Sequence, residues 1–256
     1  MEITQQGYVH ATHDNGLCTI EFFHPSHNSL PSNLLAELTQ AITAAGQDET
    51  VQIILLKSSG DRTFCAGASF DELMAIEDEI SGRNFFMGFA NVINAMRKCP
   101  KVIICRVQGK AVGGGVGLAS AADYCMATQY ASVKLSELAI GIGPFVISPA
   151  VIRKIGLEAA SQMTFNATEW YTADWAKQRG LFAEVFKTTE QLDEYLAHFI
   201  NNMRSFSPVA LSEMKKVFWE GTENWDSLLA ARAAQSGRLV LSDFTKAAIE
   251  KFKNRS

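Results

Sequence analysis

Two segments of small residues stand out as places where the backbone itself could do chemistry. Segment 109–117, GKAVGGGVG, joins a strand-like run to a helix-like run. Backbone N–H groups at such a helix start can point at an anion, which the helix dipole also favours. Segment 63–73 is rich in Ala, Gly and Ser, so a ligand could approach its backbone. Each segment alone also fits a structural role, as tight backbone packing or as a plain loop.

The glycine spacing in 109–117 excludes the two common nucleotide-binding loops. A dinucleotide-binding loop follows G-x-G-x-x-G, but counting from Gly113 or Gly115 the sixth position holds Leu118 or Ser120. A phosphate-binding G-x-x-x-x-G-K-[ST] loop needs a lysine after its glycines, whereas Lys110 comes before them. The segment therefore binds an anionic ligand other than these nucleotides, or has only a packing role.

Cysteines and histidines show no metal-binding pattern, so we expect no metal ion. Neither a C-x-x-C pair nor an H-x-x-x-H spacing occurs in the sequence. Cys65 lies beside the small residues of 63–73, but no histidine is near it in sequence, so we expect a packed thiol rather than a nucleophile. The cysteines are odd in number and mostly lie in apolar runs, as reduced core thiols do: Cys18, Cys65, Cys99, Cys105 and Cys125.

Hydrophobic periodicity predicts an α/β core that positions these segments. The pair Asn15-Gly16 between two β-rich runs predicts a hairpin over 8–23. Helix and strand then alternate. Helical stripes are expected at 30–45, 85–96 and 116–122, and strands at 51–56, 102–107 and 124–128.

Beyond about residue 151 helical patterns dominate, and only 183–186 looks like a strand. Amphipathic stripes cover 192–203, 228–241 and 244–252, and Ser207-Pro208 fits an N-cap followed by proline at the first helical position. Because no linker or low-complexity stretch interrupts the chain, we do not expect independently folded domains.

Composition excludes several classes of function. The chain has 256 residues, 47% of them hydrophobic, and a net charge of −4, which is unlike the basic surface of a nucleic-acid-binding protein. No stretch approaches the roughly 18 apolar residues of a membrane span. Residues 1–15 lack a basic and apolar leader. We therefore expect a cytoplasmic protein with neither nucleic acid nor membrane as a partner.

Taken together, three blocks resemble the crotonase family, also called the enoyl-CoA hydratase/isomerase superfamily. Residues 27–30 (HNSL) resemble its early Asn-x-Leu element, 64–69 its F-x-A-G-x-D segment, and 109–117 its G-x-A-x-G-G-G segment, with Ser136-Glu137-Leu138 following at the expected distance. The resemblance covers most of the chain. It implies an α/β fold, a spiral of β-β-α turns over 1–200, and a helical region at 201–256 that assembles trimers or dimers of trimers.

The resemblance also implies an oxyanion hole made by the backbone N–H groups of Ala66 and Gly114. Deprotonating the carbon next to an acyl-CoA thioester builds charge on its oxygen, and two fixed donors in a dry site stabilise that enolate by several kcal/mol. The substrate would carry coenzyme A, with no bound cofactor, since the thioester is the electron sink. Residues expected to contact the substrate or its CoA are Cys65, Gly67, Ala68, Ser69, Gly113 and Gly117.

Glu137 is the carboxylate that the resemblance assigns to proton transfer. Hydratases of the family share the work between two glutamates, but here the earlier position is Gly117, and Ser69 replaces the usual aspartate. A lone carboxylate suits moving a double bond, because one base can take a proton at C2 and return it at C4. The segment 141–145 also resembles the isomerase branch. Asp71, Glu72 and Asp123 are expected to cap helices or lie in solvent.

Other activities stay open at this stage. A hydratase, including one for methylglutaconyl-type substrates, a decarboxylase, a carrier-protein-linked enzyme and a catalytically silent acyl-CoA-binding paralogue all fit the same blocks. A solvent-exposed Glu137 without a role is the simplest structural alternative. Basic side chains near the end of the chain are candidates for CoA contacts, namely Lys246, Lys251 and Lys253.

Overall fold

The chain begins with an antiparallel hairpin in the computed structural model, which describes residues 7–253. Strand β1 (Tyr8–Asp14) pairs with β2 (Leu17–Phe23) across Asn15 and Gly16, both of which have positive φ. This backbone geometry is the reason that Asn-Gly is favoured in tight hairpins. The predicted hairpin is confirmed, and β2 buries alternate residues against the core.

Two sheets organise the fold. The six-stranded sheet has the order β1-β2-β3-β5-β7-β10 and is parallel from β2 onward. The four-stranded sheet has the order β4-β6-β8-β9. The further strands are β3 (Ile53–Ser58), β4 (Thr63–Cys65), β5 (Val102–Val107), β6 (Lys110–Val112), β7 (Tyr124–Thr128), β8 (Ser132–Lys134), β9 (Tyr171–Thr172) and β10 (Glu184–Phe186).

Each turn of the chain adds one strand to each sheet and then a helix. The pairs β3 and β4, β5 and β6, and β7 and β8 are such turns, which is the predicted β-β-α spiral. The helices are α1 (Ser32–Gln47), α2 (Phe70–Met74), α3 (Glu79–Lys98), α4 (Gly114–Ala121), the 3-10 helix η2 (Glu137–Ile140), α5 (Ser148–Phe165), α6 (Ala173–Gln178), α7 (Thr189–Arg204), α8 (Pro208–Phe218), α9 (Trp225–Val240) and α10 (Asp243–Lys253).

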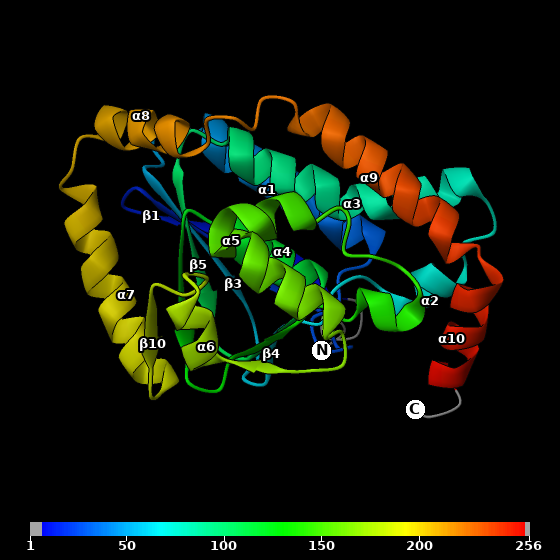
Figure 1. The fold of residues 1–256 in the computed structure, drawn as a ribbon. Helices are drawn as coiled ribbons and strands as arrows, with labels where there is room; N and C mark the ends of the chain where they lie inside the picture. The colour runs from blue at the N-terminus through cyan, green and yellow to red at the C-terminus, as the bar shows by residue number, and fades with distance from the viewer. Residues whose placement is uncertain (1–6, 254–256) are drawn as a thin grey trace.

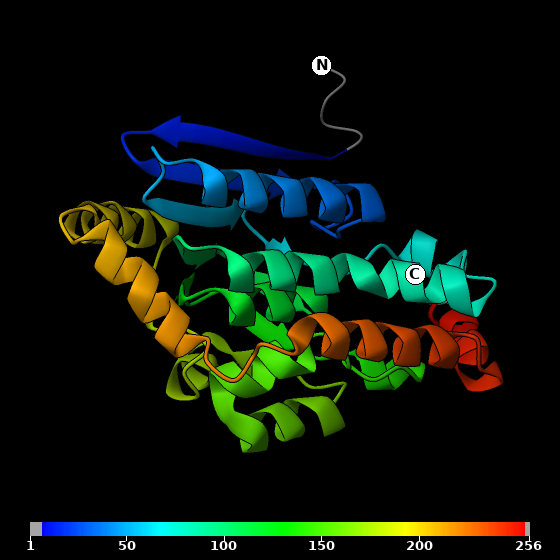
Figure 2. The same cartoon turned by 90° about the horizontal axis from the view of Figure 1, so that it is seen from above.

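Helices from both ends of the sequence pack together over the sheets. Figure 2 shows α1, α3 and α9 side by side, and α3 contacts both of its neighbours. A β-carbon at Gly82 of α3 would lie 2.9 Å from the Gly237 Cα atom of α9, so the two helices approach to backbone contact. Figure 1 places α7 beside β10 and α10 near α2. The predicted α/β architecture with C-terminal helices is therefore confirmed.

All five cysteines are buried and unpaired, as expected of core thiols. Ser207 caps α8 and Pro208 is its first residue, as the sequence pattern predicts. Between residues 7 and 253, no helix combines the length and apolar character needed to cross a membrane.

Candidate active site

Parallel pairing of β4 with β6 brings the two small-residue segments together. Thr63 is the register partner of Lys110, so the chain leaves both strands at the same edge of the sheet. The glycines then let the segments approach closely. A β-carbon at Gly115 would lie only 2.5 Å from the Cys65 carbonyl oxygen, and one at Gly67 would lie 3.7 Å from the Gly114 nitrogen.

The backbone N–H groups of Ala66 and Gly114 have no protein acceptor within residues 7–253. Gly114 is the first residue of α4, where helix geometry leaves the amide without an intrahelical partner. Gly113 precedes it with φ 51°, a conformation that glycine adopts without strain. Both N–H groups are therefore available to a ligand oxygen.

The segment around Ala66 is held in place by the early Asn-x-Leu element. The buried Asn28 side chain donates hydrogen bonds to the carbonyls of Ser59 and Thr63, each at 2.8 Å. The Leu30 N–H donates to the Gly67 carbonyl at 2.8 Å. Asn28 thus acts as a scaffold for the donor segment, a role that its sequence motif alone does not reveal.

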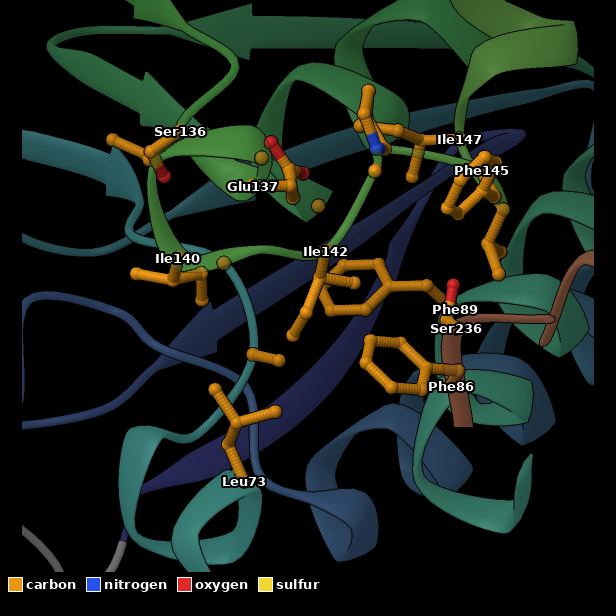
Figure 3. Close-up of a pocket in the computed structure, with 18 of the residues that line it drawn as sticks. Leu73, Phe86, Phe89, Ser136, Glu137, Ile140, Ile142, Phe145, Ile147 and Ser236 are labelled. Atoms are coloured by element: carbon orange, nitrogen blue, oxygen red, sulfur yellow. The ribbon is translucent and has the colours of Figure 1, made fainter. Parts of the chain in front are cut away.

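A small cavity of about 170 Å³ opens beside both donors and contains Glu137. Figure 3 shows the rings and branched chains that line it. Among the described residues of its wall, Glu137 is the only ionisable side chain. The larger apolar residues of the wall are Phe70, Leu73, Phe85, Phe86, Phe89, Val112, Ile140, Ile142, Pro144, Phe145, Val146 and Ile147.

Glu137 is the first residue of η2, which ends at Gly141 in the left-handed conformation. Its carboxylate lies against Gly113, because a β-carbon there would be 2.7 Å from Oε1. The Oε2 atom is buried and has no hydrogen-bond partner within the described chain. Burial raises the pKa of Glu137 to about 7. A carboxyl group with this pKa can both take and return a proton near neutral pH.

A hydrocarbon side chain fills the space beside Gly117. A β-carbon at Gly117 would lie 2.5 Å from Ile147 Cγ2 and 2.9 Å from Ile147 Cβ. The position at which hydratases of the resembled family would carry their earlier glutamate is thus closed by an apolar group. The sequence showed the missing acid, but it did not show which residue takes its place.

A large cavity of about 970 Å³ adjoins the small one, and Ala66 lines both. Ala66 therefore lies at their junction, while Gly114 lines the small cavity only. The large cavity has more ionisable side chains in its wall than the small one, namely His24, His27, Asp71, Lys134 and Lys251. Of the three lysines proposed from the sequence, Lys251 lines this cavity and Lys246 does not, while the Lys253 side chain lies outside the described residues.

Most of the residues expected to contact substrate meet at these cavities. The small cavity is lined by Ala66, Gly67, Ala68, Gly113, Gly114 and Glu137. Ser69 lines the large cavity, and its side chain also caps α2. Cys65 and Gly117 line neither cavity. Burial raises the pKa of the Cys65 thiol to about 12, so the sulfur stays protonated and is a packed thiol rather than a nucleophile.

Two of the other nearby acids lie where the sequence predicts. Asp71 and Glu72 are in the first turn of α2. The Glu72 carboxylate also accepts hydrogen bonds from the N–H and the hydroxyl of Ser32, at the start of α1.

The expectation that Asp123 caps a helix or lies in solvent is wrong. Its carboxylate is 2.7 Å from the buried Lys215 ammonium and accepts hydrogen bonds from Trp219 Nε1 and the Ile103 N–H. Helix α8 covers this position, so Asp123 is needed as the counter-charge of a lysine that is remote in sequence.

The part of the chain that the structure describes contains no cluster of three His, Cys, Asp or Glu residues able to hold a metal ion. The groups that the site offers for chemistry are two backbone amides and one carboxyl group beside an apolar cavity.

The chain is similar to several known proteins. The chain is 29% identical to a short-chain-enoyl-CoA hydratase of Clostridium acetobutylicum, covering 89% of this chain and 90% of that protein. It is 27% identical to the peroxisomal Delta(3,5)-Delta(2,4)-dienoyl-CoA isomerase of Arabidopsis thaliana, covering 78% and 76%. A crystal structure of an enoyl-CoA hydratase from Bacillus halodurans shares the fold, with a TM-score of 0.89 at 22% identity and coverage of 95% and 99%.

The family comparison covers nearly the whole chain. The model of the Enoyl-CoA hydratase/isomerase family matches residues 12–253, which include the donor segments, Glu137 and the C-terminal helices. The chain therefore belongs to the enoyl-CoA hydratase/isomerase family.

Proposed function

We propose that this enzyme moves the double bond of a 3-enoyl-CoA to the 2 position. Glu137 takes a proton from C2, and the electrons of that C–H bond pass into a dienolate whose oxygen accepts hydrogen bonds from the Ala66 and Gly114 N–H groups. The protonated Glu137 then delivers the same proton to C4. The double bond ends between C2 and C3, and the enzyme returns to its starting state.

This proposal rests on one combined observation: Glu137 is a lone carboxylate among the described residues of the small cavity, and the space beside Gly117 is filled by a hydrocarbon side chain. Hydration needs a water to be activated and a proton to be delivered to carbon, tasks that two carboxylates divide. In the small cavity Glu137 is the single carboxylate among the described wall residues, and Ile147 occupies the space beside Gly117. One base next to an apolar wall favours proton transfer within the substrate over addition of water.

We also propose that the large cavity holds the coenzyme A part of the substrate. The thioester would then lie at the junction, within reach of Ala66 and Gly114, while the acyl chain enters the small cavity. Lys134 and Lys251 supply positive charge on the wall of the large cavity for the phosphates of CoA. The sequence predicts that Cys65 and Gly117 contact the substrate. In this proposal both residues have a packing role instead.

We also propose, from the family resemblance, that residues 201–256 mediate a homotrimer or a dimer of trimers. A cytoplasmic location is a further proposal, and five buried, unpaired thiols support it. Light scattering coupled to size exclusion measures the mass of the assembly. A monomeric mass for the full chain would contradict the assembly proposal.

A single panel of assays tests the reaction. Isomerisation of 3-enoyl-CoA and hydration of 2-enoyl-CoA are measured for the wild type, Glu137→Gln and a control, Glu213→Gln. Glu213 is an exposed residue paired with Lys216 on α8, so its substitution leaves both rates unchanged. We expect Glu137→Gln to lower isomerisation by at least about 1,000-fold, since the acid/base group is lost.

The outcomes distinguish the isomerase from a hydratase and from a catalytically silent paralogue. Turnover that survives in Glu137→Gln removes Glu137 as the acid/base. Hydration that far exceeds isomerisation on every chain length assigns the enzyme to the hydratases. Acyl-CoA binding without any turnover assigns the chain to the catalytically silent paralogues.

A further inference from the structure

An unpartnered hydroxyl group lies in the apolar wall of the small cavity. Ser236 on α9 is only 1% exposed, and it lines this cavity. Within residues 7–253, the Ser236 Oγ atom takes part in none of the side-chain hydrogen bonds found on α9, which involve Asp226, Ser227, Arg232 and Gln235. Ser227 on the same helix differs, because its Oγ donates to the Asn224 carbonyl at 2.9 Å. The Ser236 hydroxyl is thus left for a molecule inside the cavity.

The position of Ser236 is fixed by the packing of α9 on α3. Its neighbour Gly237 touches the backbone of α3 at Gly82 and Arg83, which leaves α9 little freedom to shift. Figure 3 shows the side chains of Ile142 and Phe89 between Ser236 and Glu137. The hydroxyl therefore faces the part of the cavity remote from the acid/base, where the outer end of an acyl chain would lie.

A hydrocarbon chain does not satisfy this hydroxyl. Leaving a buried polar group without a partner costs about 1–3 kcal/mol, whereas an oxygen of the ligand at this place recovers the hydrogen bond. A carboxylate would be a poor ligand, because no Lys, Arg or His is present among the described wall residues to balance its charge.

The volume of the cavity limits the length of the acyl chain. An apolar protein cavity of about 150 Å³ can hold benzene. At about 170 Å³, the small cavity fits a group of similar size. An acyl group of roughly six carbons would thus bring its outer atoms to the wall that carries Ser236.

We propose that Ser236 is a specificity-determining residue, which hydrogen-bonds a neutral oxygen, as hydroxyl or ketone, on the outer part of a short acyl chain. This proposal rests on the proposed function, in that the small cavity has to receive the acyl group of an acyl-CoA. It adds the class of substrate: short, uncharged and oxygenated away from the thioester.

Calorimetric binding of saturated acyl-CoA ligands tests this assignment without any need for turnover. The ligands are hexanoyl-CoA, derivatives of it that are hydroxylated at each of the outer carbons, and adipoyl-CoA, which ends in a carboxylate. The proteins are the wild type, Ser236→Ala, Ser236→Thr and the matched control Ser227→Ala. The quantity compared is the ratio of Kd for hexanoyl-CoA to Kd for each hydroxylated derivative.

We expect this ratio to fall about 10-fold in Ser236→Ala for at least one hydroxylated derivative, as loss of one hydrogen bond predicts. Ser227→Ala leaves the ratio unchanged, and Ser236→Thr, which keeps a hydroxyl, retains the preference. Adipoyl-CoA is expected to bind the wild type at least about 100-fold more weakly than the preferred derivative.

The proposal is overturned when no ratio changes in Ser236→Ala, or when adipoyl-CoA is the tightest ligand. If enoyl-CoA is turned over while the ratios stay constant, the specificity proposal fails and the proposed reaction stands. If none of the acyl-CoA ligands binds the wild type, both fail together.

Discussion

The Glu137 carboxylate occupies the space that a side chain at Gly113 would need. A β-carbon at Gly113 would lie 2.7 Å from Glu137 Oε1, and Gly113 itself has φ 51°. Since Gly113 directly precedes Gly114, this contact places the carboxylate next to the proposed oxyanion hole. The absence of a side chain at Gly113 thus lets the proposed base lie close to the proposed donor.

Gly113→Ala is expected to lower kcat/KM for enoyl-CoA isomerisation by at least about 100-fold, because the new methyl group displaces the carboxylate. The control is Gly60→Ala, a glycine that also has positive φ, 84°, but has nothing within 4 Å of an added β-carbon. In both variants the alanine has a strained positive φ, but only the new β-carbon at position 113 would contact the Glu137 carboxylate. Equal activity of the two variants would show that the Gly113 contact has no catalytic role.

The pH dependence of kcat/KM should report the ionisation of Glu137. Burial raises its pKa to about 7, and the reaction begins with the ionised form as base. We therefore expect kcat/KM to rise with pH, to reach half its maximum near pH 7 and to level off roughly one unit above that. Initial rates at low substrate concentration across this range measure the profile. A rate that is constant from about pH 5 to pH 9 contradicts the assignment.

Glu137→Gln should stabilise the fold at alkaline pH although it removes activity. The folded state raises the Glu137 pKa from 4.5 to about 7, so it favours the protonated form. This contribution to stability is complete below about pH 4.5 and is lost as pH rises through about 7. Gln stays neutral throughout, which predicts a gain on the order of 3 kcal/mol at about pH 8 and little change at about pH 4.

Urea denaturation at these two pH values measures the difference in the free energy of unfolding. The control Glu213→Gln, at an exposed residue, should follow the wild type at both. A Glu137→Gln variant that is no more stable than the wild type at the higher pH would mean that the buried carboxylate carries no penalty.

Restoring an acid at Gly117 should require removal of the Ile147 side chain. Gly117→Glu alone is expected to destabilise the fold by at least about 1–3 kcal/mol, because its β-carbon would lie 2.5 Å from Ile147 Cγ2. The double variant Gly117→Glu/Ile147→Ala removes the contact with Cγ2 and leaves the 2.9 Å approach to the Cβ atom at position 147, so part of the overlap is relieved and the two effects on stability are not additive.

The double variant should also raise hydration of 2-enoyl-CoA relative to isomerisation by about 10-fold or more, since a second carboxylate can then activate water. Parallel assays of the two reactions in Ile147→Ala and in the double variant provide the comparison. An unchanged ratio of the two rates would show that the missing acid is not what limits hydration.

Asp123 and Lys215 should be strongly coupled in stability. Asp123→Ala leaves the Lys215 ammonium, whose side chain is 4% exposed, without a counter-charge and should cost about 3–5 kcal/mol. Lys215→Met removes the buried charge and packs in its place, so its cost is smaller. The exposed pair Lys177 and Glu184 is the control, and Glu184→Ala should cost less than about 1 kcal/mol. Urea denaturation of these variants and of the double variant Asp123→Ala/Lys215→Met measures the coupling, and additive effects of the two single substitutions would show that it does not exist.

Local patterns in the sequence determine a large part of this structure. Asn15-Gly16 predicts the first hairpin, and strands β5 and β7 begin and end where their apolar runs do. Ser207-Pro208 predicts the start of α8. These features follow from backbone conformation and from periodic burial over a few neighbouring residues, which are local properties of the chain.

The donor segments and Glu137 are also predicted from the sequence, since three short blocks and one acid carry the family resemblance. Two of those blocks are rich in glycine and alanine for a physical reason. Glycine and alanine are required wherever a ligand oxygen or another segment reaches the backbone, as Gly115 shows against Cys65.

Only the tertiary structure decided what surrounds these groups. Ile147 fills the space beside Gly117, Ser236 turns an unpartnered hydroxyl into the cavity, and Asp123 pairs with Lys215 under α8. Each relation joins residues on different elements, far apart in the chain, and depends on how helices and sheets pack. Periodicity and motif spacing describe one element at a time, so they cannot show which side chain meets which across a cavity.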